Sequence, residues 1–306
     1  MDFDVIIIGG GAAGLSAALW CDEVGLNTLL LESNAELGGQ LLWIYNQIKN
    51  HLGSEAKNGR ELRDIFVRQI ETRNFTLRLE TKVREVDLEK KSVVLEKGET
   101  LFARAIIIAA GIKRRKLNVA GEEKFQNKGI IQSGKRDQNL VKGKTAAIIG
   151  GGDAAFENAL ILAETATKVL LVHRGKDFRA RKEFVGKVLE NPKVEILTET
   201  VLTKFIGNEE IEAVELKNLK TGDTKILPAE AALIRIGVAP DTEIFRGKID
   251  LDERGYIKID SRCETNVKDI FAVGDVANPV APTVSSAVGM GATAAKAILE
   301  MMNSEG

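Results

Sequence analysis

Three glycines near the start of the chain have the spacing of a dinucleotide-binding turn. Gly9, Gly11 and Gly14 follow the run Val5-Ile6-Ile7-Ile8, whose β-branched residues predict a strand buried on both faces. Such glycines allow a tight turn, close approach of the backbone to a pyrophosphate, and close packing of a helix on the strand. The N-terminus of that helix offers unpaired N–H groups to the phosphates. This stretch predicts a dinucleotide site.

An acid follows the second predicted strand. Thr28-Leu29-Leu30-Leu31 has the apolar pattern of a buried strand, and Glu32 comes directly after it. A carboxylate there accepts hydrogen bonds from the adenosine ribose hydroxyls and repels a 2′-phosphate. The loop that follows contains Gly38 and Gly39 before Gln40, and we interpret it as a ligand contact in preference to a simple turn.

The same design occurs a second time. Gly150, Gly151 and Gly152 follow a buried strand, Ala155 stands where the third glycine is expected, and His173 follows the next strand. The 23 residues from Gly9 to Glu32 equal the 23 residues from Gly150 to His173. The chain therefore contains an internal repeat of one mononucleotide-binding unit.

The two copies differ at the residue that reads the ribose. The second copy replaces the acid by a basic group, made of His173, Arg174, Lys176 and Arg179. Basic side chains pair with a 2′-phosphate, so the second site favours NADP(H) over NAD(H). Two different dinucleotides in one chain indicate electron transfer between them, and FAD with a nicotinamide is the usual couple.

Composition excludes several other classes of protein. The 306 residues carry 43 basic and 44 acidic side chains, so no net field attracts nucleic acid or a membrane surface. No apolar run has the length of a membrane span, and the first strand begins so early that we expect no signal peptide and a cytoplasmic protein. Cys21 and Cys263 are the only cysteines, and His51 and His173 the only histidines, so no metal site is expected.

The rest of the chain alternates helical and strand patterns. Residues 59–73 have helical periodicity, 105–111 form a buried strand ending in a glycine turn, and an amphipathic helix covers about 285–302. Between the strand at 105–111 and the last helix, residues 194–236 are rich in strand patterns. The basic run Lys113-Arg114-Arg115-Lys116 is interpreted as a solvated linker in preference to a partner-binding patch.

Over essentially its full length the chain resembles the low-molecular-weight thioredoxin reductase family, which has the pyridine nucleotide-disulphide oxidoreductase fold. The matching stretches are Gly9–Gly14, Glu32, 38–40, Gly150–Ala155, His173 and Arg174 with Arg179, Ile236–Thr242 and Phe271–Val276. The resemblance implies an α/β fold of two Rossmann-like three-layer domains, the second inserted in the first. It implies an FAD domain of residues 1–114 and 244–306, an NAD(P) domain of residues 115–243, and a homodimer.

The resemblance also implies which residues hold each cofactor. For FAD these are Gly9, Gly11, Ala12, Ala13, Gly14, Glu32, Gly39, Gln40, Asn50, Ala110, Gly111, Gly274, Asp275 and Ser286. For NADP(H) they are Gly150, Gly152, Asp153, Ala154, Ala155, His173, Arg174, Arg179, Ile236 and Gly237.

One departure from the family decides the chemistry. The family carries a redox-active Cys-x-x-Cys followed by Asp about fourteen residues before the second glycine motif. Here that position reads Ser133-Gly134-Lys135-Arg136-Asp137, so Ser133 and Arg136 replace the cysteines and Asp137 is kept. Disulfide exchange needs a thiolate, which a hydroxyl and a guanidinium do not supply. We expect no dithiol thioredoxin reductase activity.

Two further departures concern the cofactors. Gly175 stands where the family's NADP signature has its second arginine, with Lys176 beside it to compensate, and Pro282-Thr283-Val284 replaces the family's Arg-Gln-Ala before the last helix. The surroundings of the flavin therefore differ along with the loss of the disulfide.

Two functions from different classes follow. The first is a flavin-dependent NAD(P)H oxidoreductase that passes electrons from FAD to a non-disulfide acceptor, such as a small redox protein (ferredoxin or flavodoxin) or a small molecule. The second is an FAD-binding protein with a degraded NADP site, which holds a second flavin or other nucleotide or has a regulatory role. Lys135 or Arg136 either stabilises the anionic reduced flavin or is surface charge on a turn; the sequence leaves both readings open.

Overall fold

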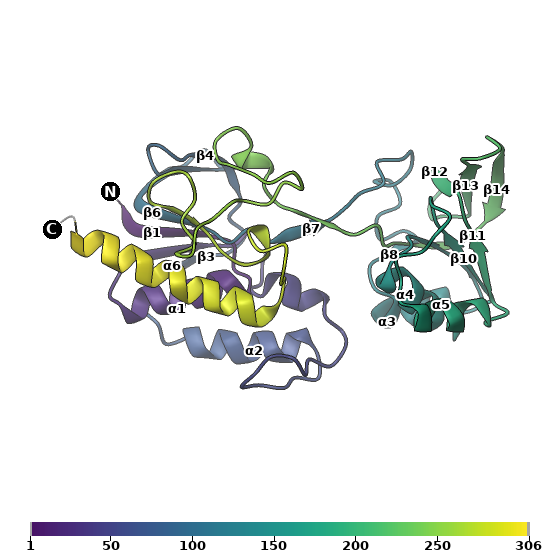
Figure 1. Ribbon diagram of the computed structural model, residues 1–306, viewed down its shortest axis with the longest axis horizontal. Helices are drawn as coiled ribbons and strands as arrows, with labels where there is room; N and C mark the ends of the chain where they lie inside the picture. Colours follow the sequence, from purple (N-terminus) through teal and green to yellow (C-terminus); the bar gives the residue numbers. More distant parts are fainter. Residues whose placement is uncertain (1, 305–306) are drawn as a thin grey trace. The chain divides into compact units, whose positions relative to one another are not determined.

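The computed structural model describes residues 2–304, which form two compact units. The first unit combines the residues up to Lys113 with those from Ala239 onward, and the second contains Arg114–Val238. Each unit is built on its own main sheet (Figure 1). Each unit also has its own hydrophobic core. Among residues 2–304, no helix combines the length and the apolar character needed to cross a membrane.

The first unit is built on a seven-stranded sheet of order β3-β2-β1-β6-β5-β4, with β17 also paired to β6. Strands β3, β2, β1, β6 and β17 pair in parallel, whereas β5 and β4 continue the sheet as an antiparallel meander. The strands are β1 (Phe3–Ile8), β2 (Thr28–Leu31), β3 (Thr76–Arg78), β4 (Val83–Asp87), β5 (Ser92–Leu95), β6 (Thr100–Ile108) and β17 (Ile270–Ala272).

Helices cover one face of this sheet. They are α1 (Ala12–Glu23), α2 (Gly59–Ile70) and α6 (Val284–Ser304). The unit also has the 3₁₀ turns η1 (Gly39–Trp43), η3 (Glu243–Phe245) and η4 (Gly274–Val276), and Phe245 and Val276 pack into the core on the meander face. α1 and α6 run side by side (Figure 1), because Gly291 lets α6 approach the backbone of Ala13 and Ala17. Alternate residues of β1 enter two different cores: Val5 and Ile7 face the helices, while Ile6 and Ile8 face the meander. This burial on both faces confirms the interpretation of the β-branched run.

The second unit has three layers. Its five-stranded parallel sheet, of order β11-β10-β9-β15-β8, lies between helices on one side and an antiparallel sheet of order β12-β13-β14 on the other. The strands are β8 (Ile130–Ile131), β9 (Thr145–Ile149), β10 (Lys168–Val172), β11 (Val194–Leu197), β12 (Thr200–Ile206), β13 (Ala213–Asn218), β14 (Thr224–Pro228) and β15 (Ala231–Ile234). The helices are α3 (Gly134–Asp137), α4 (Asp153–Ala163), α5 (Lys182–Leu189) and the 3₁₀ turn η2 (Gln138–Val141).

The two chain crossings between the units pair as a short ribbon of β7 (Ile112–Arg114) and β16 (Val238–Pro240). The boundary between the units falls within the basic run 113–116, and Lys113, Arg115 and Lys116 are exposed, as expected for a solvated linker. Lys113 pairs with Asp241 and Glu243, Arg115 donates to the carbonyl of Val238, and Arg114 and Lys116 bond within the second unit. The run therefore also forms ion pairs and hydrogen bonds within each unit.

Candidate cofactor sites

In the turn after β1, Gly9 and Gly14 are closely packed against backbone atoms, whereas the space beside Gly11 is open. A side chain on Gly14 would collide with the carbonyl of Gly9, and one on Gly9, whose φ is +111°, would collide with the carbonyl of Ala109. In contrast, a Cβ on Gly11 would meet nothing nearer than the Cα of Gly39, at 4.0 Å. Helix α1 begins at this open point. The turn therefore has the free space beside a helix N-terminus that a pyrophosphate requires.

The carboxylate of Glu32 ties this turn to the end of β2. Its Oε2 accepts a 2.8 Å hydrogen bond from the amide of Gly10, and its Oε1 accepts 2.8 Å and 2.6 Å bonds from the amide and side chain of Asn34. Glu32 is only 4% exposed. Because each carboxylate oxygen accepts about two hydrogen bonds, Oε2 keeps capacity for a ribose hydroxyl. The acid thus holds the turn as well as standing at the predicted ribose position.

Segments far apart in the sequence meet beside the same turn. Gln40 donates a 2.9 Å hydrogen bond from Nε2 to Oδ2 of Asp275, and a Cβ on Gly111 would lie 3.5 Å from that nitrogen. Gly274 has φ +74°, and its Cα faces the methyl group of Ala13. Burial raises the pKa of Asp275, and the bond from Gln40 offsets part of this effect. The structure therefore brings together the predicted residues of α1, η1, η4 and the end of β6.

Other predicted FAD residues lie nearby in sequence but make different contacts. Ser286, in the first turn of α6, donates its hydroxyl to the carbonyls of Ala281 and Thr283, while the hydroxyl of Thr283 caps the helix by accepting from the amide of Ser286. Asn50 is exposed in the loop after η1, while its neighbour His51 places Nδ1 3.1 Å from the hydroxyl of Ser285. Sequence reasoning missed this link between His51 and α6. Ala110 follows β6 next to Gly111.

The second glycine turn repeats the packing of the first. Gly150 lies against the carbonyl of Arg235, and Gly151 lies against the ring of His173, so neither position has room for a side chain. At Gly152 a Cβ would meet no atom within 4 Å, and α4 begins at the next residue, followed by Ala154 and Ala155. This unit therefore also presents open space at a helix N-terminus.

The residues after β10 separate into two groups. The ring of His173 packs against Phe178 with ring centroids 5.3 Å apart, and its Nε2 lies 3.0 Å from the carbonyl of Asp177. His173 is thus part of the packing. The other group consists of Arg174, Lys176 and Arg179, which are exposed and make no side-chain hydrogen bond or ion pair within residues 2–304. Their charges remain available to an anion, which fits a 2′-phosphate.

The carboxylate of Asp153, in contrast, already accepts hydrogen bonds within the unit. These bonds come from the amide of Arg181 at 2.7 Å and from the Nε of Arg181 at 2.9 Å. Ile236 and Gly237 follow β15 at the same edge of the sheet, where Gly237 has φ +92°. Asp153 therefore fixes the segment after β10 relative to α4.

The segment 133–137, predicted to lie at the family's Cys-x-x-Cys position, forms one turn of helix. The hydroxyl of Ser133 caps it by accepting a 3.3 Å bond from the amide of Arg136, and the carbonyl oxygen of the Asn158 side chain receives the amide of Gly134. Arg136 binds the carboxylate of Asp137 through two nitrogens, at 2.5 and 2.8 Å. Asp137 also accepts from the amides of Gln132 and Ser133. The ion pair of Arg136 with Asp137 and the cap by Ser133 therefore hold this turn.

Burial alone raises the pKa of Asp137, but the hydrogen bonds from Arg136 and the two amides outweigh it, so the net pKa lies below its usual value. Asp137 is therefore ionised at neutral pH and bound to the guanidinium of Arg136. Arg136 is directed toward its neighbouring acid in this arrangement.

Neither cysteine can replace the missing dithiol. Cys21 lies in α1 and Cys263 in the loop before β17, and both are buried and unpaired with one another. Burial raises the pKa of Cys21 to about 12 and that of Cys263 to about 11. Both therefore remain neutral thiols at physiological pH, and neither is a nucleophile.

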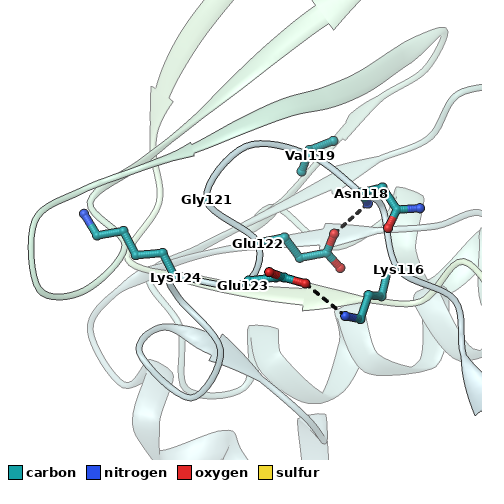
Figure 2. Close-up of a pocket in the computed structure, with 7 residues that line it drawn as sticks. All are labelled: Lys116, Asn118, Val119, Gly121, Glu122, Glu123 and Lys124. Atoms are coloured by element: carbon teal, nitrogen blue, oxygen red, sulfur yellow. Dashed lines mark hydrogen bonds and ion pairs between the residues drawn. The ribbon is translucent and has the colours of Figure 1, made fainter.

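A hollow in the second unit is lined by a loop that follows the basic run. Figure 2 shows Glu122 and Glu123 bonded to Asn118 and Lys116 respectively. Glu122 is buried and accepts hydrogen bonds from the amides of Leu117 and Asn118, so its carboxylate stabilises the loop. None of the lining residues belongs to a glycine motif. We assign this hollow a structural role.

The chain is similar to known proteins over most of its length. The family model described as pyridine nucleotide-disulphide oxidoreductase matches residues 3–291. The chain is 32% identical to the "34.2 kDa protein in rubredoxin operon" of Clostridium pasteurianum, over 95% of this chain and 94% of that protein. It is 33% identical to a thioredoxin reductase of Streptomyces coelicolor, over 95% and 91% of the two chains. The crystal structure of Lactococcus lactis thioredoxin reductase superimposes with a TM-score of 0.83 at 30% identity, over 99% of each chain.

The chain belongs to the pyridine nucleotide-disulphide oxidoreductase family. Within this family it is a flavoprotein oxidoreductase of the thioredoxin reductase-like type, whose members use FAD and NADPH. The predicted fold of two Rossmann-like domains and the predicted cofactor pair are confirmed. The open space at Gly11 and Gly152, and the uncompensated basic group after β10, fit these cofactors.

Proposed function

We propose that this protein takes electrons from NADPH onto FAD and passes them directly to an acceptor other than a protein disulfide. The observation that carries the proposal is the capped turn 133–137, in which Ser133 and Arg136 occupy the family's cysteine positions. The buried, neutral thiols of Cys21 and Cys263 support it. When bound, FAD accepts a hydride from the nicotinamide and supplies electrons to the acceptor.

In this proposal the first unit, with Gly11, Glu32, Gln40 and Asp275 among its contacts, holds FAD. The second unit holds NADP(H), with the diphosphate at the Gly152 turn and the 2′-phosphate among Arg174, Lys176 and Arg179. These three side chains supply the positive charge, because His173 is committed to packing against Phe178. The domain limits 115 and 243, and the individual site residues, belong to the proposal.

The acceptor in this proposal is a small redox protein. The relative from Clostridium pasteurianum is named for a rubredoxin operon, so rubredoxin joins ferredoxin and flavodoxin as a candidate. A homodimer in the cytoplasm completes the proposal. The alternative, an FAD protein with a degraded second site, has less support, because the three unpaired basic side chains are retained.

Anaerobic mixing tests the proposal. NADPH should bleach the oxidised-flavin absorbance within seconds and NADH should do so more slowly. The reduced protein should then be reoxidised by at least one of rubredoxin, ferredoxin and flavodoxin. An unchanged spectrum with both nucleotides would contradict the proposal and favour the alternative. Two flavins released per chain would likewise show that the second site holds a flavin.

A further inference from the structure

Two arginines converge on one carbonyl at the edge of the second sheet. Nη2 of Arg235 donates to the carbonyl oxygen of Gln132 at 2.8 Å, and Nη1 donates to that of Ile234 at 3.0 Å. Nη1 of Arg114 donates to the same Gln132 oxygen at 2.6 Å and to Oε1 of Gln132 at 3.1 Å. Two cationic groups thus share one neutral acceptor.

The charge of Arg235 is not neutralised by its hydrogen-bond partners, both of which are backbone carbonyls. Asp137 exerts an attractive charge on it, but that carboxylate is bonded to Arg136 and to two amides. Burial and the charge of Arg114 lower the pKa of Arg235 to about 10, so the guanidinium stays charged at neutral pH. A partly buried cation beside another cation is unfavourable, and an approaching anion would relieve this cost.

The position of Arg235 is that of a ligand contact. It directly follows β15, its amide donates to the carbonyl of Ile149, and its carbonyl lies against Gly150 of the glycine turn. In the sheet order β11-β10-β9-β15-β8, the chain places β10 on one side of β9 and β15 on the other. Ligands of parallel sheets bind at the carboxyl ends of the strands where the order reverses in this way.

A dinucleotide at this edge spans both sides of the turn. Its adenosine half belongs on the β10 side, where Arg174 and Arg179 lie, and its other half extends over the end of β15. A guanidinium has five N–H groups, and the bonds of Arg235 use two of them. The remaining N–H groups suit the paired oxygens of a phosphate.

We propose that Arg235, supported by Arg114, forms a subsite for the phosphate of the nicotinamide half of the nucleotide. This inference rests on the proposed function of the second unit as an NADP(H) site. It assigns a phosphate-binding role to a residue outside the glycine motif and outside the basic group after β10. The subsite does not distinguish NADP(H) from NAD(H), because both carry this phosphate.

Titration calorimetry of the FAD-loaded protein tests the subsite with three probes: NADP⁺, NAD⁺ and adenosine 2′,5′-bisphosphate, which lacks the nicotinamide half. A charge-assisted hydrogen bond lost on binding corresponds to about a tenfold loss of affinity or more. Arg235→Ala should lower the affinities for NADP⁺ and NAD⁺ by the same factor, about tenfold. The affinity for the bisphosphate should stay within about twofold of that of the wild-type protein. Arg235→Lys, which keeps the charge, should recover part of the loss.

Arg179→Ala is the matched comparison on the opposite side of the turn. This variant should lower the affinities for NADP⁺ and the bisphosphate and leave the affinity for NAD⁺ unchanged. Binding of the bisphosphate also shows that the Arg235→Ala protein is folded; if that variant does not fold, Arg114→Ala takes its place with the same expected pattern.

Unchanged NADP⁺ affinity in Arg235→Ala, or an equal loss for the bisphosphate, would overturn the subsite while leaving the proposed function intact. A wild-type protein that binds none of the three probes would instead contradict the proposed function, and the subsite would fall with it.

Discussion

The amide of Gly10 donates a 2.8 Å hydrogen bond to the carboxylate of Glu32, which joins the first glycine turn to the end of the neighbouring strand. The two residues are 22 positions apart, and the bond is buried. The residue expected to read the ribose therefore also fixes the turn that receives the diphosphate. One side chain couples the two halves of the proposed FAD contact.

Glu32→Ala tests this coupling. Removing the carboxylate leaves the buried amide of Gly10 without its acceptor, which costs about 1–3 kcal/mol, whereas the exposed Asn34 can bond to water instead. We expect a lower thermal midpoint and weaker retention of FAD, measured by melting and by flavin release on dilution. Glu36→Ala is the control, because Glu36 forms exposed ion pairs with Arg60 and Arg63. Equal melting and flavin retention in both variants would contradict the coupling.

Gly11→Ala and Gly152→Ala test which glycines serve ligands. Both residues have extended backbone with negative φ, at −77° and −104°, and a Cβ on either meets nothing closer than 4.0 Å. We expect stability to change by no more than about 1 kcal/mol in each variant. Affinity for FAD should fall in the first and affinity for NADP⁺ in the second, measured by fluorescence and calorimetry.

Gly186→Ala is the matched control for this pair, since Gly186 lies in α5 with open space around it and outside both turns. It should alter neither affinity. Full nucleotide affinity in both turn variants would show that the free space at Gly11 and Gly152 is not occupied by the cofactors.

The double variant Cys21→Ala with Cys263→Ala tests the absence of thiol chemistry. Because both thiols are buried and their pKa values lie near 12 and 11, neither forms a thiolate at neutral pH. We expect NADPH oxidation with an external acceptor to remain within about twofold of wild type, allowing for the lost packing of two buried side chains. The native wild-type protein should also resist alkylation by iodoacetamide at pH 8. Loss of turnover in the folded double variant would assign a thiol to the mechanism.

Asp137→Asn tests the charged turn through its pH dependence. The pKa of Asp137 is lowered in the folded state, so its ionised form stabilises the fold above the unfolded pKa, near 3.9, and that contribution disappears as the pH falls through the folded value. At pH 7 we expect the variant to melt a few degrees below wild type. The difference should shrink as the pH falls below about 4. A difference that stays constant from pH 7 to pH 3 would show that the charge of Asp137 does not contribute.

The fold followed from the sequence wherever the pattern was long and local. The strand at 28–31 was predicted at its observed bounds, because it is a short buried apolar run that ends at a charged residue. Helix ends were less accurate: the predicted helix 59–73 ends at Ile70. The helical turn at 134–137 is too short to show a helical periodicity in the sequence. Its stabilisation by Asn158 is a tertiary contact, which the local sequence does not reveal.

The candidate sites were predictable where glycine spacing carries the information. Sequence alone could not show that Glu32 holds Gly10, or that His173 packs against Phe178 while Arg174 and Arg179 stay unpaired. It also missed Arg235, whose only sequence signal is a charged residue directly after a buried strand. These roles arise from contacts between segments that are distant along the chain. The individual cofactor contacts stay predictions until a nucleotide is bound.

The most direct test of the central claim is an anaerobic titration of the FAD-loaded protein with NADPH, with free thiols counted before and after. A disulfide is a two-electron acceptor, so a flavoprotein that carries a redox-active pair takes up electrons beyond those needed by its flavin. We predict that one equivalent of NADPH per flavin completes the bleaching, with no further uptake and no new thiols. Uptake of a second equivalent together with two new thiols per chain would contradict it.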